Sequence, residues 1–347
     1  MAVTIRDVAK AARVSLATVS RALNGKENVA EKTRRHVSAV ASRLGFVPHE
    51  GARSLSRSRT HCVGAVLPDL HGEFFSELIR GIDLAARDHG LHLLLSCSHG
   101  DEHELAAALR TMRGRVDGLL VMSPYASPLV LGRNLQASMP TVLLNSGPGN
   151  DRYPALAVDN YGGACAMMRH LVGRGHKRIA MISGPAGNFD ARERQAGYVD
   201  MLNELLPGTP SQVLRGDFTE ESGYRAGKRL LATAERPDAV FAANDMMAVG
   251  CLFALTEGGL RVPGDLAIAG FDDIPIARYI TPPLTTVRVR IAELGDIALE
   301  RLVQAIDKAG RDDHAIQTLR TELVVRSSCA RQPASLTALS PPGKRPP

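Results

Sequence analysis

The chain has 347 residues, 44% of them hydrophobic, which suits a small domain together with one or two larger ones. Residues 1–60 contain 12 Lys+Arg and 4 Asp+Glu, a net charge of +8. The remaining chain contains 30 and 32, a net charge of −2, and together the two parts give the overall +6. The basic excess therefore lies in the first sixth of the chain, which is typical of a nucleic-acid-binding segment attached to a nearly neutral body.

The sequence does not indicate secretion, a membrane anchor or a metal centre. The start of the chain lacks the apolar segment of a signal peptide, and no uninterrupted apolar run reaches membrane length. The cysteines are odd in number, widely spaced and without a Cys-x-x-Cys motif, as expected for free thiols in a reducing cytoplasm. They are Cys62, Cys97, Cys165, Cys251 and Cys329.

Three short helical patterns follow one another between Thr4 and Leu44. Thr4 is a suitable N-cap for the first, Ser15 caps the second, and the third begins at Glu31. Gly25 marks the end of the second helix. Two helices joined by so few residues predict a helix-turn-helix. The inward-facing residues of the three helices are Ile5, Val8, Ala9, Ala12, Val19, Ala22, Leu23, Val37, Val40, Ala41 and Leu44.

The outer face of the second helix has side chains suited to the major groove of DNA. Arg21 can form two hydrogen bonds with guanine, and Leu16 or Ala17 can pack on a thymine methyl group. Hydroxyl and amide side chains are better suited to phosphate oxygens. A small helical bundle with a solvated Arg21 is the alternative from spacing alone. The expected contacts in this region are Thr4, Ser15, Leu16, Ala17, Thr18, Ser20, Arg21 and Asn24.

This segment resembles the headpiece of the LacI/GalR (lactose repressor/galactose repressor) family of regulators. The matching stretches are Thr4 to Ala12, Val14-Ser15, Thr18 to Arg21, Asn24-Gly25, Thr33-Arg34, Leu44 to Pro48 and Ala52 to Leu55. The resemblance extends over nearly the whole chain. It implies an operator-binding head, a hinge helix and a ligand-binding body.

The resemblance makes residues 47–60 a hinge helix that orders on DNA. Leu55 occupies the position of a side chain that inserts into the minor groove, and Arg53 is a second expected DNA contact. An ordinary linker is the alternative, since the segment is too short for a stable isolated helix. Gly51 departs from the better helix formers expected here and costs such a helix about 1 kcal/mol.

From Cys62 onward, short apolar runs alternate with helical patterns, which predicts parallel α/β sheets. The first series has strands at Cys62–Leu67, Leu91–Ser96, Gly118–Met122 and Thr141–Leu144, with helices at Phe74–His89, Glu102–Met112 and Leu129–Ala137. The second has strands at Ala155–Val158, Arg178–Ile182, Ala239–Ala242 and Leu266–Gly270, with helices near Tyr161–Val172, Ala191–Leu205, Glu221–Ala232 and Asp245–Glu257. Strands at Leu284–Val287 and Leu319–Val325 flank a final helix at Ile291–Ala309.

Two series of strands predict two doubly wound lobes, and the resemblance makes them a periplasmic-binding-protein-like body. The expected domains are a helix-turn-helix over 1–46, the hinge over 47–60, and a body over 61–329 that also dimerises. Lobe 1 takes about 61–159 and 288–319, and lobe 2 about 160–287 and 320–329. The resemblance implies three crossing segments, near Asp159, Val287 and Arg320. Residues 330–347 contain five prolines and are expected to be disordered.

Sequence motifs of enzymes are missing. There is no Gly-x-Gly-x-x-Gly after the first strand, no phosphate-binding Gly-x-x-x-x-Gly-Lys-Ser/Thr, no His-Glu-x-x-His and no Gly-x-Ser-x-Gly. His99, Asp101, Glu102 and His103 are possible metal ligands, but they precede a helix, where acids and capping residues are routine. We therefore expect a solvated loop there, no metal site and no catalytic residues.

Polar and aromatic residues recur where the predicted strands end, which is where a ligand cleft lies in doubly wound sheets. Such side chains suit a neutral polyhydroxylated ligand, although each of them could instead cap a helix or pack in the core. By resemblance, Arg194, Asn244 and Asp272 match the principal effector contacts, and Phe218 stands where some relatives carry Trp. The expected effector-binding residues are Asp69, Phe74, Phe75, Asn145, Asp190, Arg192, Arg194, Phe218, Asn244 and Asp272.

Together these features predict a cytoplasmic, homodimeric repressor of carbohydrate-utilisation genes. Its partners would be pseudo-palindromic double-stranded operator DNA and a small-molecule effector, a sugar or sugar phosphate, with no other cofactor. A dimer is expected because the C-terminal Leu heptads of tetrameric relatives are missing. Regulation of purine or nucleoside metabolism is the alternative within the family. A free sugar-binding protein or a sugar-acting enzyme is the alternative outside it.

Overall fold

The structure is a computed structural model, and it describes residues 3–23, 29–46, 59–150, 152–307 and 315–330. The chain separates into a helical N-terminal unit and a larger α/β unit, which we call the head and the body. Among the described residues, no helix combines the length and the apolar character that a membrane span requires.

The head consists of three helices, α1 (Ile5–Ala12), α2 (Leu16–Leu23) and α3 (Glu31–Arg43). Every residue that the sequence placed on an inward stripe belongs to or packs against one apolar core. This core also includes Val29, which the periodicity did not mark because it lies between helices. The predicted three-helix arrangement is therefore confirmed.

Two capping residues set where α1 and α2 begin. The backbone N–H and hydroxyl of Thr4 both donate to the Asp7 carboxylate, at 2.9 and 2.7 Å, in a capping box. Ser15 Oγ accepts a hydrogen bond from the backbone N–H of Thr18 at 3.1 Å. Both residues therefore act as the predicted caps, and the turn between the helices is completed by Arg13 with φ of 54°.

The first sheet of the body has six strands in the order β11-β5-β4-β3-β1-β2. The pairs β1–β3, β3–β4, β4–β5 and β5–β11 are parallel. Since β1 lies between β2 and β3, the winding direction reverses beside β1, as in other doubly wound folds. The strands are β1 (Cys62–Leu67), β2 (His92–Cys97), β3 (Gly118–Met122), β4 (Thr141–Leu144), β5 (Ala155–Val158) and β11 (Ile316–Leu319).

The second sheet repeats this arrangement with four parallel strands in the order β7-β6-β8-β9. Here β6 lies between β7 and β8, so a second reversal occurs beside β6. The strands are β6 (Ile179–Ser183), β7 (Gln212–Arg215), β8 (Ala239–Ala242) and β9 (Ala267–Ala269). The expected fold class, a helix-turn-helix head with two doubly wound lobes, is confirmed.

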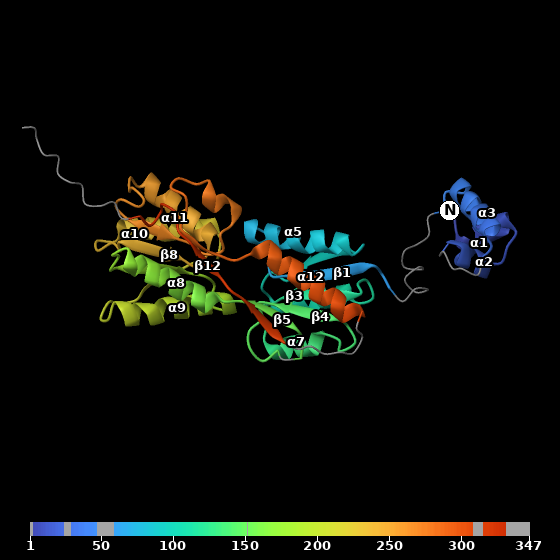
Figure 1. Ribbon diagram of the computed structural model, residues 1–347, viewed down its shortest axis with the longest axis horizontal. Helices are drawn as coiled ribbons and strands as arrows, with labels where there is room; N and C mark the ends of the chain where they lie inside the picture. Colours follow the sequence, from blue (N-terminus) through green and yellow to red (C-terminus); the bar gives the residue numbers. More distant parts are fainter. Residues whose placement is uncertain (1–2, 24–28, 47–58, 151, 308–314, 331–347) are drawn as a thin grey trace, which may run out of the picture. The chain divides into compact units, whose positions relative to one another are not determined.

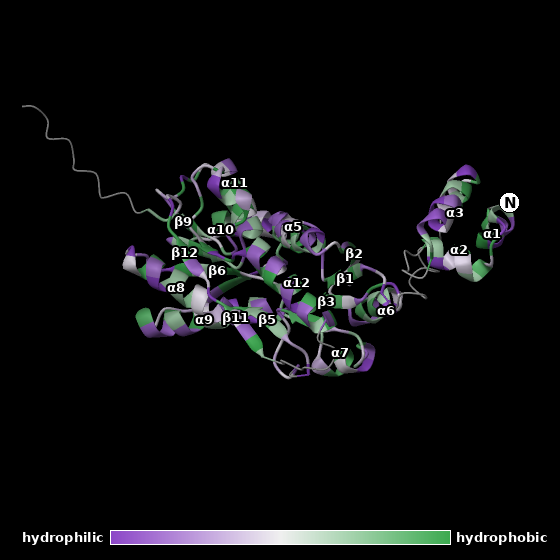
Figure 2. Cartoon of the chain, turned by 45° about the vertical axis from the view of Figure 1, so that its right-hand side comes forward, coloured by the Kyte–Doolittle hydropathy of each residue, from purple (hydrophilic) through white to green (hydrophobic). Residues whose placement is uncertain are grey.

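Helices cover both faces of each sheet (Figure 1). In the first lobe α5 and α12 pack together on one side and α7 lies on the other, while in the second lobe α10 and α11 lie opposite α8 and α9. Figure 2 shows hydrophobic colour concentrated in the strands and hydrophilic colour on the outer helix surfaces. The helices are α5 (Glu73–Asp88), α6 (Glu102–Met112), α7 (Pro128–Asn134), α8 (Asn160–Gly173), α9 (Phe189–Leu205), α10 (Glu220–Ala232), α11 (Asp245–Glu257), η1 (Pro275–Arg278) and α12 (Ile291–Asp307).

The chain passes between the lobes where the crossing segments were expected. The first passage follows β5 at Asp159, and the others run through β10 (Thr286–Arg288) and β12 (Glu322–Val324), which pair with each other antiparallel. The first and third passages are joined, since Asp159 N–H donates to Leu319 O at 3.0 Å and Thr321 Oγ1 donates to Asp159 O at 3.3 Å. The connection between the lobes is therefore a hydrogen-bonded group of segments.

Several sequence expectations for the body are wrong in detail. The predicted series lists Ala155–Val158 with the second set of strands, although the expected bounds of lobe 1 include it, and it pairs with β4 and β11 in the first sheet. The single strand expected at Leu319–Val325 is divided between β11 and β12, because the chain changes lobes at Arg320. The helix expected to end at Ala137 ends at Asn134, since Leu135 is extended. Strand β7 was missed because it is short and partly exposed.

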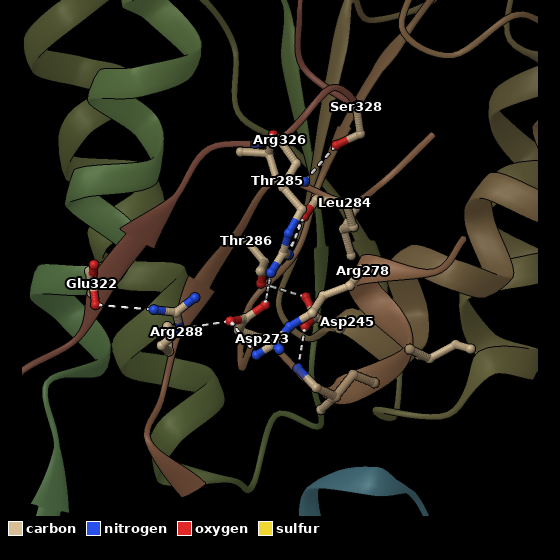
Figure 3. A network of polar contacts seen from close by, with 12 residues as sticks. Asp245, Asp273, Arg278, Leu284, Thr285, Thr286, Arg288, Glu322, Arg326 and Ser328 are labelled. Atoms are coloured by element: carbon tan, nitrogen blue, oxygen red, sulfur yellow. Dashed lines mark hydrogen bonds and ion pairs between the residues drawn. The ribbon is translucent and has the colours of Figure 1, made fainter. Parts of the chain in front are cut away.

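Two buried carboxylates hold the crossing strands to the second lobe (Figure 3). Asp245 accepts hydrogen bonds from Thr286 Oγ1 at 2.6 Å and from Ile274 N–H at 3.0 Å. Asp273 pairs with Arg288 of β10 at 2.7 Å and with Arg326, which follows β12. The carboxylate of Asp273 therefore ties two crossing segments to the loop after β9.

We predict that Asp273→Ala lowers the free energy of unfolding of the body by about 3 kcal/mol, because it leaves the largely buried Arg326 without its ion-pair partner. Urea unfolding followed by circular dichroism measures this. Asp265→Ala is the matched control, since it removes an ion pair with Arg261 that is mostly solvent-exposed, and it should change stability little. Equal losses in the two variants would contradict the assigned role of Asp273.

Candidate functional site

The exposed side of α2 is the candidate DNA-contacting surface of the head. Val19 and Ala22 are buried in the core, whereas Ala17 and Arg21 are exposed and Leu16 is 45% exposed. Since α2 is amphipathic and its apolar side is used by packing, the other side is available to a partner. The structure thus places the base-reading candidates together on one helix face.

The other DNA candidates differ in availability. Ser15 Oγ and Thr18 Oγ1 lie 2.8 Å apart at the start of α2, where the backbone N–H groups and the helix dipole also attract phosphate. The Thr4 side chain is exposed but engaged with Asp7, so its hydroxyl must keep or exchange that bond to reach DNA. Ser20 is partly buried beside Val19. Asn24, Arg53 and Leu55 lie outside the described residues.

The body contains a cleft between its two lobes, at the ends of the central strands of both sheets. The cleft has a volume of about 350 Å³, within the range of small-molecule sites. It lies beside both points of winding reversal, where doubly wound sheets bind ligands. The lining residues are Pro68, Asp69, His71, Gly72, Phe74, Phe75, His99, Gly100, Met122, Pro124, Tyr125, Asn188, Asp190, Arg194, Asp217, Phe218, Thr219, Asn244, Met246 and Asp272.

Eight of the ten effector candidates line this cleft: Asp69, Phe74, Phe75, Asp190, Arg194, Phe218, Asn244 and Asp272. They come from both lobes and from loops far apart in the sequence. The rings of Phe74 and Phe75 are 5.4 Å apart and nearly perpendicular, so they form an apolar corner. The cleft combines apolar walls with a few convergent polar groups.

The structure does not bring Arg192 and Asn145 to the cleft wall. Arg192 is exposed beside Phe189, because residues 190 and 194 share one face of α9 while 192 points to the opposite face. The structure therefore does not place Arg192 among the residues that line the cleft. Asn145 is buried after β4, and its amide hydrogen-bonds Asp190 from behind the cleft wall.

Arg194 is the only guanidinium of the described residues that lines the cleft, and it is 4% exposed. Its Nε donates to Asn160 Oδ1 at 2.8 Å and its Nη1 donates to Ala243 O at 2.6 Å. Nη1 also lies 3.1 Å from the Asp272 carboxylate, and the guanidinium stacks 3.8 Å from the centre of the Phe271 ring. Its position is thus fixed before any ligand arrives.

Two carboxyl groups share that single guanidinium. Burial raises the pKa of Asp190 to about 7, against the opposing effects of Arg194 and Asn145. Burial likewise raises the pKa of Asp272 to about 6, partly offset by Arg194. Near neutral pH the cleft floor therefore offers both hydrogen-bond donors and acceptors, which suits a polar ligand without a net charge.

Several cleft residues were not chosen from the sequence. Asn188 caps α9 by accepting a hydrogen bond from Ala191 N–H at 3.0 Å. Asn244 caps α11 in the same way, accepting from Met247 N–H at 3.0 Å, and its Nδ2 donates to Phe218 O at 2.9 Å. Of these two, only Asn244 had been predicted. Tyr125 follows β3, and the rule that ligands meet strand ends could have identified it. Met246 has no comparable sequence signal.

His99 also lines the cleft, although the sequence placed it in a possible metal cluster. The neighbouring Asp101 caps α6 by accepting bonds from the N–H groups of His103 and Glu104, at 2.8 and 3.0 Å. Within the described ranges, no three His, Cys, Asp or Glu side chains are grouped to hold a metal ion. Asp101 therefore has a capping role in this loop.

A helix-turn-helix head and a two-lobed body with an interlobe cleft define a class of DNA-binding proteins with a periplasmic-binding-protein-like domain. Comparisons agree with this class. Residues 4–49 match the family described as bacterial regulatory proteins, lacI family, and residues 168–329 match the periplasmic binding protein-like domain.

Whole-chain comparisons give the same result. The HTH-type transcriptional repressor PurR of Escherichia fergusonii is 36% identical over 334 residues, covering 95% of this chain and 98% of the relative. The lac repressor dimer bound to operator and the anti-inducer ONPF has a TM-score of 0.82 at 28% identity, covering 96% of this chain and 100% of that one. The CelR–cellobiose complex has a TM-score of 0.68 at 30% identity, with coverages of 94% and 99%.

The chain therefore belongs to the lacI family of bacterial regulatory proteins. It is a DNA-binding transcriptional repressor and not an enzyme.

We predict that Asp190→Asn flattens the pH dependence of the body's stability. The pKa of about 7 in the folded state exceeds the ordinary 3.8, so folding takes up a proton that the unfolded chain has released. The wild type should therefore lose stability as pH rises from about 4 to 7, and the variant should lose less. Urea unfolding at several pH values measures both, with the exposed Asp83→Asn as control. Equal slopes in all three proteins would refute the prediction.

Proposed function

We propose that this repressor works as a cytoplasmic homodimer on pseudo-palindromic operator DNA and responds to a small sugar-like effector. The observation that carries the proposal is the cleft between the two lobes, whose floor pairs Arg194 with Asp272 and holds Asp190 near the same guanidinium. A polyhydroxylated ligand both donates and accepts hydrogen bonds, as these groups require. The genes controlled would be those for using the effector.

The head supports recognition of the major groove by α2. The exposed face of α2 presents Leu16, Ala17 and Arg21, and the basic residues of the first 60 positions attract phosphates. A dimer would place two such helices on half-sites one helical turn or a multiple of it apart, which implies a two-fold symmetric operator. The solved lac repressor dimer bound to operator supports this arrangement.

The body has apolar surfaces that suit contact with a second copy. In the first lobe, β2 is the last strand of its sheet and exposes Leu94 and Leu95. In the second lobe, Phe253 of α11 is 63% exposed and Tyr279, which follows η1, is 78% exposed. Because monomeric proteins seldom expose such large side chains in groups, we assign these surfaces to the dimer contact.

A sugar is favoured over a purine by the neutral, hydrogen-bonding floor of the cleft and by the likeness to the CelR–cellobiose complex. The higher identity to PurR favours the purine alternative. In either case the effector acts only if it binds two arrangements of the lobes with different affinity. The hydrogen-bonded crossing segments would then transmit the change toward the head.

We predict that Arg21→Ala reduces discrimination between operator and random DNA, at a cost of about 1–3 kcal/mol in specific binding. Selection from a random duplex library supplies the preferred operator, and salt-controlled titrations compare both proteins on it and on a scrambled duplex. Lys32→Ala on α3 is a charge-matched control and should weaken both complexes alike. Undiminished preference in Arg21→Ala would remove this residue from base recognition.

We predict that Arg194→Ala abolishes the response to effector while operator binding persists, because the guanidinium belongs to the cleft and not to the head. Thermal-shift screening with glucose, galactose, ribose, cellobiose, guanine and adenosine identifies the responsive compound, and operator titrations with that compound follow. Arg192→Ala changes the same residue type on the opposite face of α9 and should keep the response. A normal response in Arg194→Ala would show that the effector binds elsewhere.

A further inference from the structure

Asn160 lies behind the cleft floor and contacts both of the charged groups that α9 contributes to it. Its Nδ2 donates to Asp190 Oδ1 at 3.0 Å, and its Oδ1 accepts from Arg194 Nε at 2.8 Å. The side chain is 3% exposed and lies outside the set of residues that line the cleft. It is therefore placed to act on a ligand only through its two neighbours.

The chemistry of the neighbours fixes which way the amide points. The guanidinium of Arg194 can only donate, so it must meet the amide oxygen of Asn160. The amide nitrogen is then directed at Asp190 Oδ1, which must accept. Asn160 therefore fixes Asp190 Oδ1 as an acceptor, while the amide of Asn145 is a second hydrogen-bond partner of the same carboxyl.

Asn160 also belongs to the first passage between the lobes. It is the first residue of α8, directly after Asp159, and its Nδ2 lies 3.3 Å from Val158 O at the end of β5. Asp159 in turn is hydrogen-bonded to the third passage through Leu319 O and Thr321. Asn160 therefore connects Asp190 and Arg194 to the segments that join the lobes.

We propose that Asn160 is a positioning residue of the effector site, which orients Asp190 and Arg194 together and links them to the lobe-crossing segments. The inference rests on the proposed effector role of the cleft. The charged groups near Asp190 are Arg194 and Glu193 on α9 and Asp272 after β9, with the phenol of Tyr125 after β3. Of these groups only Arg194 is positive, and it is already paired with Asp272. A neutral amide such as that of Asn160 can hydrogen-bond Asp190 without adding a further charge.

The test is the pH dependence of stability in the full chain carrying Asn160→Asp, measured without any effector. The new carboxylate can still accept from Arg194, but it cannot donate to Asp190 unless one of the two acids keeps a proton. Two facing carboxyls that share a proton release it at higher pH than one alone. The unfolding equilibrium constant of the variant should therefore rise about tenfold between pH 7 and pH 8, against about twofold for the wild type with its pKa of about 7.

The exchange variant Asn160→Asp/Asp190→Asn separates positioning from simple packing. It restores one amide and one carboxylate with their partners reversed, so the added pH dependence should disappear. Asn203→Asp, an exposed change on α9, should keep the wild-type profile. The proposal is overturned if Asn160→Asp follows the wild-type pH profile, or if its loss is equal at every pH and the exchange restores nothing. Since no effector is used, failure of every compound in the effector screen would overturn the sugar proposal separately.

Discussion

The cleft depends on one constraint: a single buried guanidinium serves two buried carboxyl groups. Arg194 alone cannot neutralise both Asp190 and Asp272, whose side chains are both buried. Burial therefore raises the pKa of each acid, and a bound proton neutralises the carboxyl group that the guanidinium does not. The floor that results is close to neutral, polar and fixed in position. Such a floor discriminates by hydrogen-bond pattern more than by charge.

The same loop that presents Asp272 to the cleft presents Asp273 to the crossing strands. The two residues are adjacent and both have positive φ, 110° and 55°, so the backbone turns sharply between a ligand-facing and a strand-anchoring side chain. Asp273 holds Arg288 and Arg326, which belong to two of the crossing segments. At the start of α8, Asn160 connects Asp190 to the first crossing segment. Each cleft acid, Asp272 or Asp190, is thus next to a residue that holds a crossing segment: Asp273 in the first case and Asn160 in the second.

The sequence predicted the head almost completely because its helices are short, capped by Thr4 and Ser15, and amphipathic with little ambiguity. It predicted most of the body as well, since buried parallel strands are continuous apolar runs. The errors of the sequence prediction concern strands whose sheet is decided by their pairing partners and not by local sequence. Nothing local in Ala155–Val158 states which strands it pairs with, so the strand pattern alone listed it with the second series. The resemblance, by contrast, implied crossings near Asp159 and Arg320, and the chain does pass between the lobes there. Arg192 was chosen beside Arg194 by residue type, although helical periodicity alone separates their faces.

The sequence also left a choice between capping and ligand binding for several polar residues, and the structure shows why that choice is not exclusive. In a doubly wound lobe each helix begins at the edge of the sheet where the preceding strand ends. The residue that caps such a helix, for example Asn188 or Asn244, therefore also lines the cleft. Its oxygen is used by the helix, but Asn244 retains an amide nitrogen directed at Phe218 O, and that bond places the ring against the cleft. Because the fold requires polar residues at these positions, the identity of each one can vary with the ligand while the capping function is kept.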